Sequence, residues 1–196
     1  MDGGSAVYGE GRSVVAGSAV YFAAGDPRNQ RGPTPGAQTT RRAEITALAR
    51  ALEGDTGDLR IRTDSRHVCD GFEQLDLRYG RAFMRRPLRA EEMPHADLWR
   101  RVHCARRRRE ERGLTTALRW IPSQSRIPPA AAAPGLGAAE EEKDVAGNKG
   151  AHELATLARH EEAARRGLPP RRKERRRRPA RSAVGVTPRG PRPPPG

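Results

Sequence analysis

The distribution of charge along the chain sets the first limit on what it can fold into. Residues 165–192 hold eleven Arg and one Lys against one Glu, which is +11 of the total formal charge of +14. They lie in a stretch of Pro, Gly and Arg that offers almost nothing to bury. We therefore expect one folded domain over residues 1–162 and a disordered basic tail over residues 163–196.

The composition of the chain indicates the kind of partner it binds. Hydrophobic residues make up 35% of the 196 residues and aromatic residues 4%, against roughly 45–50% apolar residues in an ordinary globular chain. The net charge of +14 predicts a polyanionic partner, most simply a nucleic acid. No apolar run approaches the ~20 residues of a membrane span, and no signal peptide opens the chain. We expect an intracellular protein with no membrane partner, and the basic tail is compatible with a nuclear-localisation signal.

Hydrophobic spacing predicts strands and helices in mixed order before the tail. Three segments have the character of strands: 17–25, 58–64 and 114–122. Three segments have apolar residues near helical spacing: 40–53, 94–113 and 145–164. Thr39 or Thr40 is placed to cap the first helix, and Gly113 to end the second. Residues 125–143 are expected to form a long loop or insertion. This order of elements predicts an α/β layer with helices on a sheet.

Three acidic residues stand out by their placement in this pattern. Asp64 ends a predicted strand, Glu44 lies on the first predicted helix, and Asp2 precedes a Gly-Gly pair that permits a sharp turn. Carboxylates that converge from separate elements make an oxygen-rich site suited to Mg²⁺ or Mn²⁺. Two such ions about 3.5–4 Å apart support phosphodiester cleavage. Taken singly, the same residues also fit a helix cap, a solvated charge and a turn.

The order of the motifs resembles that of the type 1 ribonuclease H family. The most specific motifs are TTRRAE at 39–44, IRTDSRHV at 61–68 and GNKGAHELA at 147–155. The similarity covers about residues 2–160. It implies a ribonuclease H-like α/β fold, in which helices flank a mixed five-stranded sheet.

The resemblance also implies hydrolysis of the RNA strand of an RNA–DNA hybrid, with two Mg²⁺ or Mn²⁺ ions. By motif match, the expected metal-binding and catalytic residues are Asp2, Glu44, Asp64 and His152. The residues expected to contact substrate are Thr39, Thr40, Arg41, Ser65, Gln124 and Asn148. We expect the domain to act as a monomer, with the hybrid nucleic acid as its partner.

The chain departs from the family pattern at three places. His152 stands where the family has its fourth carboxylate, and imidazole suits Mn²⁺ better than Mg²⁺. Gln124 stands where a mobile-loop histidine is usual, and glutamine cannot shuttle a proton. Met1 immediately precedes Asp2, so the first strand is expected to be truncated and Asp2 to be held poorly.

Two functions remain open from the sequence. One is a metal-dependent endoribonuclease of RNA–DNA hybrids, with activity reduced by these departures. The alternative is a non-catalytic hybrid-binding module, such as a decayed retroelement domain. A third candidate, a largely disordered basic nucleic-acid-binding protein, is disfavoured because the motifs occur in an ordered run.

Overall fold

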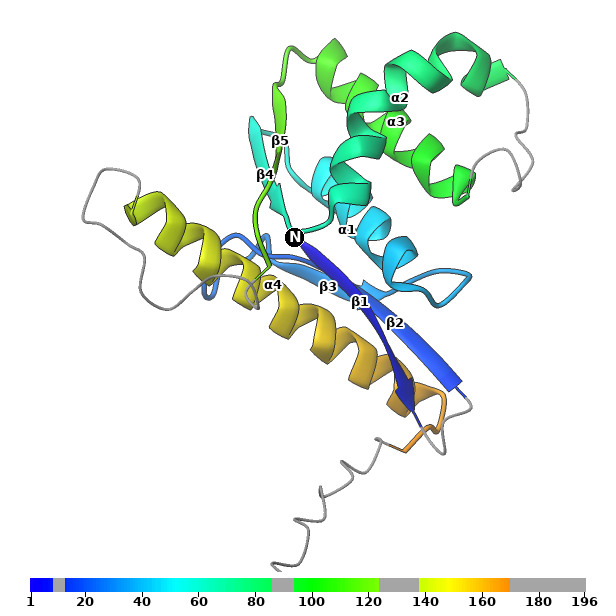
Figure 1. The fold of residues 1–196 in the computed structure, drawn as a ribbon, viewed down its shortest axis with the longest axis vertical. Coiled ribbons are helices and arrows are strands. Elements are labelled where there is room, and N and C mark those ends of the chain that lie inside the picture. Colours follow the sequence, from blue (N-terminus) through cyan, green and yellow to red (C-terminus); the bar gives the residue numbers. More distant parts are fainter. Residues whose placement is uncertain (9–12, 86–93, 124–137, 170–196) are drawn as a thin grey trace, which may run out of the picture.

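The computed structural model describes residues 1–8, 13–85, 94–123 and 138–169, and Figure 1 shows how they fold. The strands are β1 (Asp2–Tyr8), β2 (Ser13–Val20), β3 (Gln30–Pro33), β4 (Leu59–Thr63) and β5 (Thr116–Trp120). The helices are α1 (Thr40–Gly54), α2 (Arg66–Arg85), α3 (Ala96–Glu111) and α4 (Ala138–Arg165). The fold is therefore mixed α/β, as the sequence predicts.

The described strands form two hydrogen-bonded sheets. β1, β2 and β3 are antiparallel in that order, and β4 pairs with β5 in parallel. The two sheets meet at Met1, whose nitrogen donates a 2.9 Å hydrogen bond to the Arg62 carbonyl of β4. In Figure 1 the N-terminus lies at the junction of β1 and β4. At this junction the hydrogen bond from Met1 to Arg62, rather than a continuous ladder, links the two described sheets.

Helices α1 and α4 cover opposite faces of the antiparallel sheet (Figure 1). A β carbon on Gly3 of β1 would overlap the backbone of Ala43 on α1, and one on Gly17 of β2 would overlap Ala155 on α4. Glycine at both positions permits close approach of helix and strand. Because Gly3 follows Asp2 and Ala43 precedes Glu44, this contact brings two of the candidate carboxylates near each other.

The main hydrophobic core lies between α1, the strand pair β4–β5 and helices α2 and α3. Ile45 and Leu48 of α1 are fully buried there, with Ile61 of β4, Val68 of α2 and Trp99 of α3 packed in the same cluster. Burial of this apolar surface is the main stabilising contribution to such a fold. It also fixes α1 relative to β4, the two elements that carry Glu44 and lead to Asp64.

Two predicted helix boundaries are confirmed, and a helix begins inside one predicted loop. α1 begins after Thr39, whose hydroxyl accepts a 3.2 Å hydrogen bond from the Arg42 amide. α3 ends before Gly113, which adopts a left-handed φ of 72°. Of the loop or insertion expected over residues 125–143, residues 125–137 lie outside the described residues, and residues 138–143 are helical because α4 already begins at Ala138. The sequence AAEEEK at that point consists of strong helix formers.

The remaining predicted boundaries shift by a few residues. The strand predicted over 17–25 is β2, which lies earlier because a turn follows Val20. α4 continues to Arg165 with Ala163 buried, so the expected tail cannot start at residue 163. Residues 170–196, where most of that predicted tail falls, lie outside the described residues. Within the described part of the chain, no helix is long and apolar enough to cross a membrane.

Candidate active site

Asp2 is the first residue of β1, and its side chain is held from two directions. Its Oδ1 accepts a 2.7 Å hydrogen bond from the Gly3 amide, and its Oδ2 lies 3.0 Å from Nδ1 of His152. Pairing of β1 with β2 and the bond from Met1 to the Arg62 carbonyl hold the backbone around it. The expectation of a poorly held Asp2 is wrong, because the residues that follow it form the strand.

Glu44 projects from α1 toward the start of α2. The Ser65 hydroxyl donates a 2.7 Å hydrogen bond to its Oε2 and accepts one of 3.4 Å from the Val68 amide, as an N-cap does. Burial raises the pKa of Glu44 from 4.5 to about 7, although the bond from Ser65 lowers it. The charges of Asp2 and Asp64 contribute to this rise.

Asp64 directly follows β4, where the chain turns into α2. Nε1 of Trp120 donates a 3.0 Å hydrogen bond to the Asp64 carbonyl, because the parallel pairing of Thr63 with Trp120 brings the indole alongside. Burial and then the charge of Asp64 raise the pKa of Asp2 above its ordinary value. Asp2, Glu44 and Asp64 therefore share one electrostatic neighbourhood.

His152 projects from α4 toward the start of β1. Its side chain is 64% exposed, whereas that of Asp2 is 12% exposed. The hydrogen bond and charge of His152 lower the pKa of Asp2, against the larger effect of burial and the charge of Asp64. The imidazole therefore influences the group of carboxylates by lowering the pKa of Asp2.

The chemistry of these side chains fits a hard divalent cation. Carboxylates that are drawn together repel one another when ionised, and a divalent cation removes that repulsion. The raised pKa values of Asp2 and Glu44 reflect this repulsion as well as burial. Among the residues that the structure describes, no three His, Cys, Asp or Glu side chains form a group that would hold a metal ion. Mg²⁺ usually keeps several water ligands, so an open set of carboxylates is compatible with it.

The residues expected at the substrate from the TTR motif lie at the exposed start of α1. Thr39 is the N-cap, and the hydroxyl of Thr40 lies 2.9 Å from that of Ser5 on β1. Arg41 is exposed, and its charge lowers the pKa of Glu44. The motif therefore borders the carboxylates and presents two hydroxyls and one cation to solvent.

The other expected substrate residues are placed differently. Ser65 is 6% exposed and holds Glu44, so its side chain positions a carboxylate rather than facing solvent. Asn148 is 7% exposed on α4 and is among the residues that line a cavity beside Met1. Gln124 lies outside the described residues.

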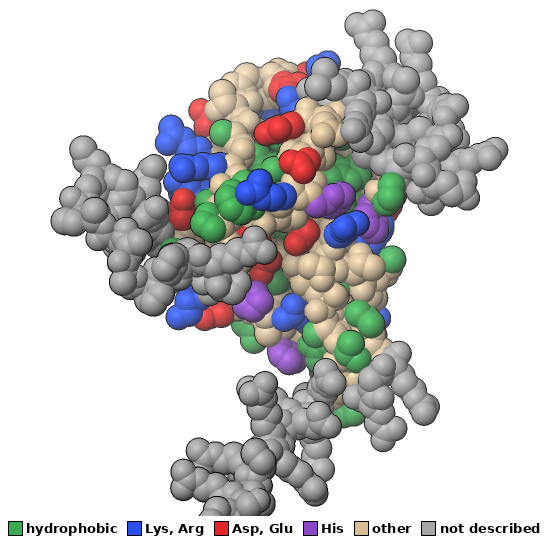
Figure 2. All heavy atoms as spheres, viewed as in Figure 1, with side chains coloured by type: hydrophobic (Ala, Val, Ile, Leu, Met, Phe, Trp, Pro, Cys, Tyr) green, Lys and Arg blue, Asp and Glu red, His purple; other side chains and the backbone are tan. Residues whose placement is uncertain are grey.

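The sequence did not single out Trp120 and its neighbours as part of the site. Trp120 is partly exposed, its indole donates a hydrogen bond to the Asp64 carbonyl, and the Arg66 guanidinium lies 4.0 Å above its ring. His67 and Arg41 are also electrostatic neighbours, since the charge of Arg41 lowers the pKa of His67. On the face drawn in Figure 2, acidic side chains lie among Arg, Lys and His side chains. The strand-end position of Trp120 beside Asp64 was the available signal.

A family comparison and a known relative point to the same family. The family described as RNase H matches residues 1–122. Ribonuclease H of Schizosaccharomyces pombe (strain 972 / ATCC 24843) is 45% identical over 65 residues, which are 33% of this chain and 25% of that protein. A solved structure of the foamy viral protease-reverse transcriptase in complex with dsDNA has a TM-score of 0.52 at 18% identity, covering 82% of this chain and 91% of that chain. This last similarity concerns the fold alone.

Proposed function

The chain belongs to the RNase H family, and from this premise we propose that it is an endoribonuclease that hydrolyses the RNA strand of RNA–DNA hybrids. The observation that carries the proposal is the shared neighbourhood of Asp2, Glu44 and Asp64, in which burial and like charge raise the pKa of Glu44 to about 7. The family generally uses divalent metal ions. We expect two ions here, Mg²⁺ or Mn²⁺, with these three carboxylates and His152 as ligands.

The residues of this chain prepare the carboxylates for hydrolysis. Ser65 orients Glu44 through its hydroxyl, and Trp120 fixes the backbone of Asp64 through its indole. Divalent ions, when bound, activate a water and stabilise the leaving oxygen of the scissile phosphate. Because the three carboxylates come from β1, from α1 and from the residue after β4, correct packing of these elements is a condition for activity.

The start of α1 supplies the surface for the hybrid. Thr39, Thr40 and Arg41 are exposed beside the carboxylates. Hydroxyl side chains can bond the 2′-hydroxyls that distinguish RNA from DNA, and an arginine can bond phosphate. The basic charge of the chain adds affinity that does not depend on sequence and that falls with added salt.

His152 sets the expected metal preference. It offers nitrogen where a carboxylate offers charged oxygen, so one expected ligand is neutral when unprotonated. Imidazole favours Mn²⁺ over Mg²⁺, and a protonated imidazole beside Asp2 repels any cation. We therefore expect higher activity in Mn²⁺ than in Mg²⁺.

Cleavage of an end-labelled RNA–DNA hybrid, in Mg²⁺ and separately in Mn²⁺, tests the proposal. We expect metal-dependent cleavage that Asp64→Asn reduces at least about a hundredfold, since this variant removes a charged ligand and keeps the shape. Asp70→Asn, on the exposed side of α2, is the matched control and should cleave normally. A folded protein that cleaves no hybrid in either metal contradicts the proposal.

A non-catalytic hybrid-binding module is the second candidate, and the contact between His152 and Asp2 favours it. A hydrogen bond from an imidazole to the first carboxylate stabilises that carboxylate without a metal. In that case the protein should bind hybrid with equal affinity in Mg²⁺ and in EDTA. Fluorescence anisotropy of a labelled hybrid measures this directly.

A further inference from the structure

The side chain of Arg159, on α4, lies across β2 and reaches β1 close to the candidate active site. A β carbon on Gly17 of β2 would be 2.9 Å from its Cγ, and one on Gly4 of β1 would overlap its Nη1. The aliphatic part of the side chain therefore covers β2, and the guanidinium lies over β1. Glycine at these two positions leaves the space that this arrangement needs.

The guanidinium lies on the same face of β1 as Asp2. Side chains two residues apart in a strand point to the same face, so positions 2 and 4 both face α4. Asp2 contacts His152 there, and Arg159 follows His152 by about two turns of the helix. Gly4 lies about 6.6 Å beyond Asp2 along the strand. This spacing is comparable to that between neighbouring phosphates of a nucleic-acid strand.

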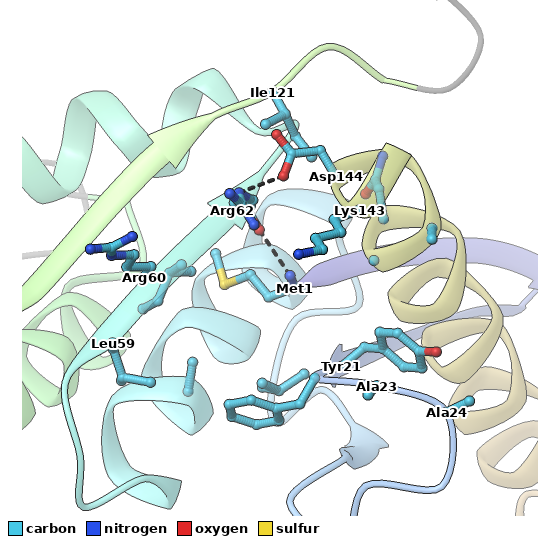
Figure 3. A pocket seen from close by; sticks show the side chains of 17 residues that line it. Met1, Tyr21, Ala23, Ala24, Leu59, Arg60, Arg62, Ile121, Lys143 and Asp144 are labelled. Atoms are coloured by element: carbon cyan, nitrogen blue, oxygen red, sulfur yellow. Dashed lines mark hydrogen bonds and ion pairs between the residues drawn. The ribbon is translucent and has the colours of Figure 1, made fainter. Parts of the chain in front are cut away.

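No acidic side chain in the described part of the chain pairs with this guanidinium. Nη2 donates a 2.7 Å hydrogen bond to the Thr156 hydroxyl, whereas Nε is buried without a hydrogen-bond partner. By contrast, Arg62 beside the cavity in Figure 3 is paired with Asp144 at 2.5 Å. A partly buried cation without a counter-charge is costly, so an anion from outside the chain would stabilise Arg159.

The proposed path of the nucleic acid passes this guanidinium. Ser5, the residue after Gly4, lies with its hydroxyl 2.9 Å from that of Thr40 at the start of α1. A strand that contacts both Asp2 and Thr40 therefore runs along β1 beside Gly4. The anion that such a strand offers at each step is a phosphate, and guanidinium groups bind phosphates through directed N–H donors.

We propose that Arg159 binds the phosphate next to the scissile one in the strand that is cleaved, and so holds that strand against β1. This inference rests on the proposed function as a hybrid nuclease. The bond to Thr156 fixes the plane of the guanidinium and leaves Nη1, over β1, to donate to the phosphate. The contact is the same before and during cleavage, so it contributes to affinity rather than to the chemical step.

Fluorescence anisotropy of a labelled RNA–DNA hybrid, titrated with the full chain in EDTA at several salt concentrations, tests the contact. Arg159→Met keeps a long side chain and removes the charge, and we expect the Kd to rise about tenfold. The slope of log Kd against log salt concentration should fall by about 0.7–0.9, the value for one phosphate. Arg159→Lys keeps the charge and should restore that slope.

Arg31→Met is the matched control for the loss of one charge. Arg31 is exposed on β3, at the opposite edge of the sheet from β1. Its replacement should leave both the Kd and the salt slope nearly unchanged. Equal effects of Arg31→Met and Arg159→Met would mean that only the net charge of the protein matters, and would overturn the proposal.

Steady-state cleavage in Mn²⁺ distinguishes substrate binding from structural support of Asp2. We expect Arg159→Met to raise KM about tenfold and to leave kcat nearly unchanged, since the lost contact is uniform. A lower kcat at an unchanged KM would mean that Arg159 acts by holding the carboxylates, and would contradict the proposal. An unmodified protein that binds hybrid but does not cleave it contradicts the proposed function alone, because the salt slope in EDTA still tests Arg159.

Gly4→Ala tests the same contact with every charge retained. Its β carbon meets only the end of the flexible Arg159 side chain, so the protein should fold with its guanidinium displaced. We expect weaker hybrid binding, and no further loss when Arg159→Met is added. Additive losses in the double variant, or unchanged binding in a folded Gly4→Ala protein, would overturn the proposal.

Discussion

Nδ1 of His152 lies 3.0 Å from Oδ2 of Asp2, which ties the start of β1 to α4. The contact joins two residues that are 150 positions apart in the sequence. It also means that the residue in place of a fourth carboxylate interacts directly with the first one. We therefore expect metal preference to be coupled to the protonation of Asp2.

His152→Asp should shift the metal preference from Mn²⁺ toward Mg²⁺. A carboxylate adds a charged oxygen ligand, which Mg²⁺ prefers to nitrogen. We expect the ratio of Mn²⁺ to Mg²⁺ cleavage rates to fall about tenfold. Glu153→Gln, at the neighbouring exposed position, should leave that ratio unchanged. A ratio that does not move in His152→Asp would show that His152 is not at the metal.

Ser65→Ala should shift the pH dependence of cleavage upward. The Ser65 hydroxyl lowers the pKa of Glu44, so its removal leaves that pKa higher and the ionised carboxylate appears only at higher pH. Loss of the N-cap of α2 should also cost about 1 kcal/mol of stability. Ser65→Thr keeps a hydroxyl and should restore the pH profile. The pH–rate profile separates this effect from simple destabilisation.

Glu44→Gln should stabilise the metal-free protein at high pH. The folded-state pKa of Glu44 is about 7, above its ordinary 4.5, so its contribution to stability is complete below pH 4.5 and is lost as the pH rises through 7. Since the side chain is partly exposed, we expect a gain of about 1–2 kcal/mol at pH 8 and none at pH 4.

Urea denaturation in EDTA at the two pH values measures the effect of Glu44→Gln. Glu73→Gln, on an exposed position of α2, is the matched control. Its free energy of unfolding should stay equal to that of the unchanged protein at both pH values. Added Mg²⁺ should reverse the order of stability in favour of the unchanged protein, because the cation binds the carboxylates. Equal stability of the two proteins at pH 8 would contradict a raised pKa.

Local signals in the sequence were enough to predict α1, α3, β4 and β5. The cap at Thr39 and the stop at Gly113 depend on neighbouring residues only, and both are visible in the sequence. The short strand β3 was missed because Gln30–Pro33 has no apolar alternation and is held by pairing with β2. The start of α4 was missed because 125–143 was read as one segment.

The candidate site was less predictable than the fold. Asp2, Glu44 and Asp64 were proposed from motifs, but spacing alone does not predict that they influence one another electrostatically, which depends on the packing of Gly3 against Ala43. The role of Trp120 depends on the pairing of β5 with β4, a non-local contact. The gap between the two sheets likewise depends on three-dimensional pairing and is invisible in any local pattern.

Gly3→Ala should disrupt both stability and cleavage. A β carbon at this position overlaps the backbone of Ala43, so β1 and α1 must move apart, and with them Asp2 and Glu44. Overpacking of this kind costs about 1–3 kcal/mol. We expect cleavage to fall at least about a hundredfold even where the protein remains folded, since catalytic geometry tolerates little displacement.

Gly57→Ala makes only an ordinary contact with Asp55 and should change neither property. Circular dichroism with thermal melting, run beside the hybrid cleavage assay, distinguishes lost folding from lost geometry. Full activity in a folded Gly3→Ala protein would mean that the approach of β1 to α1 does not position the carboxylates.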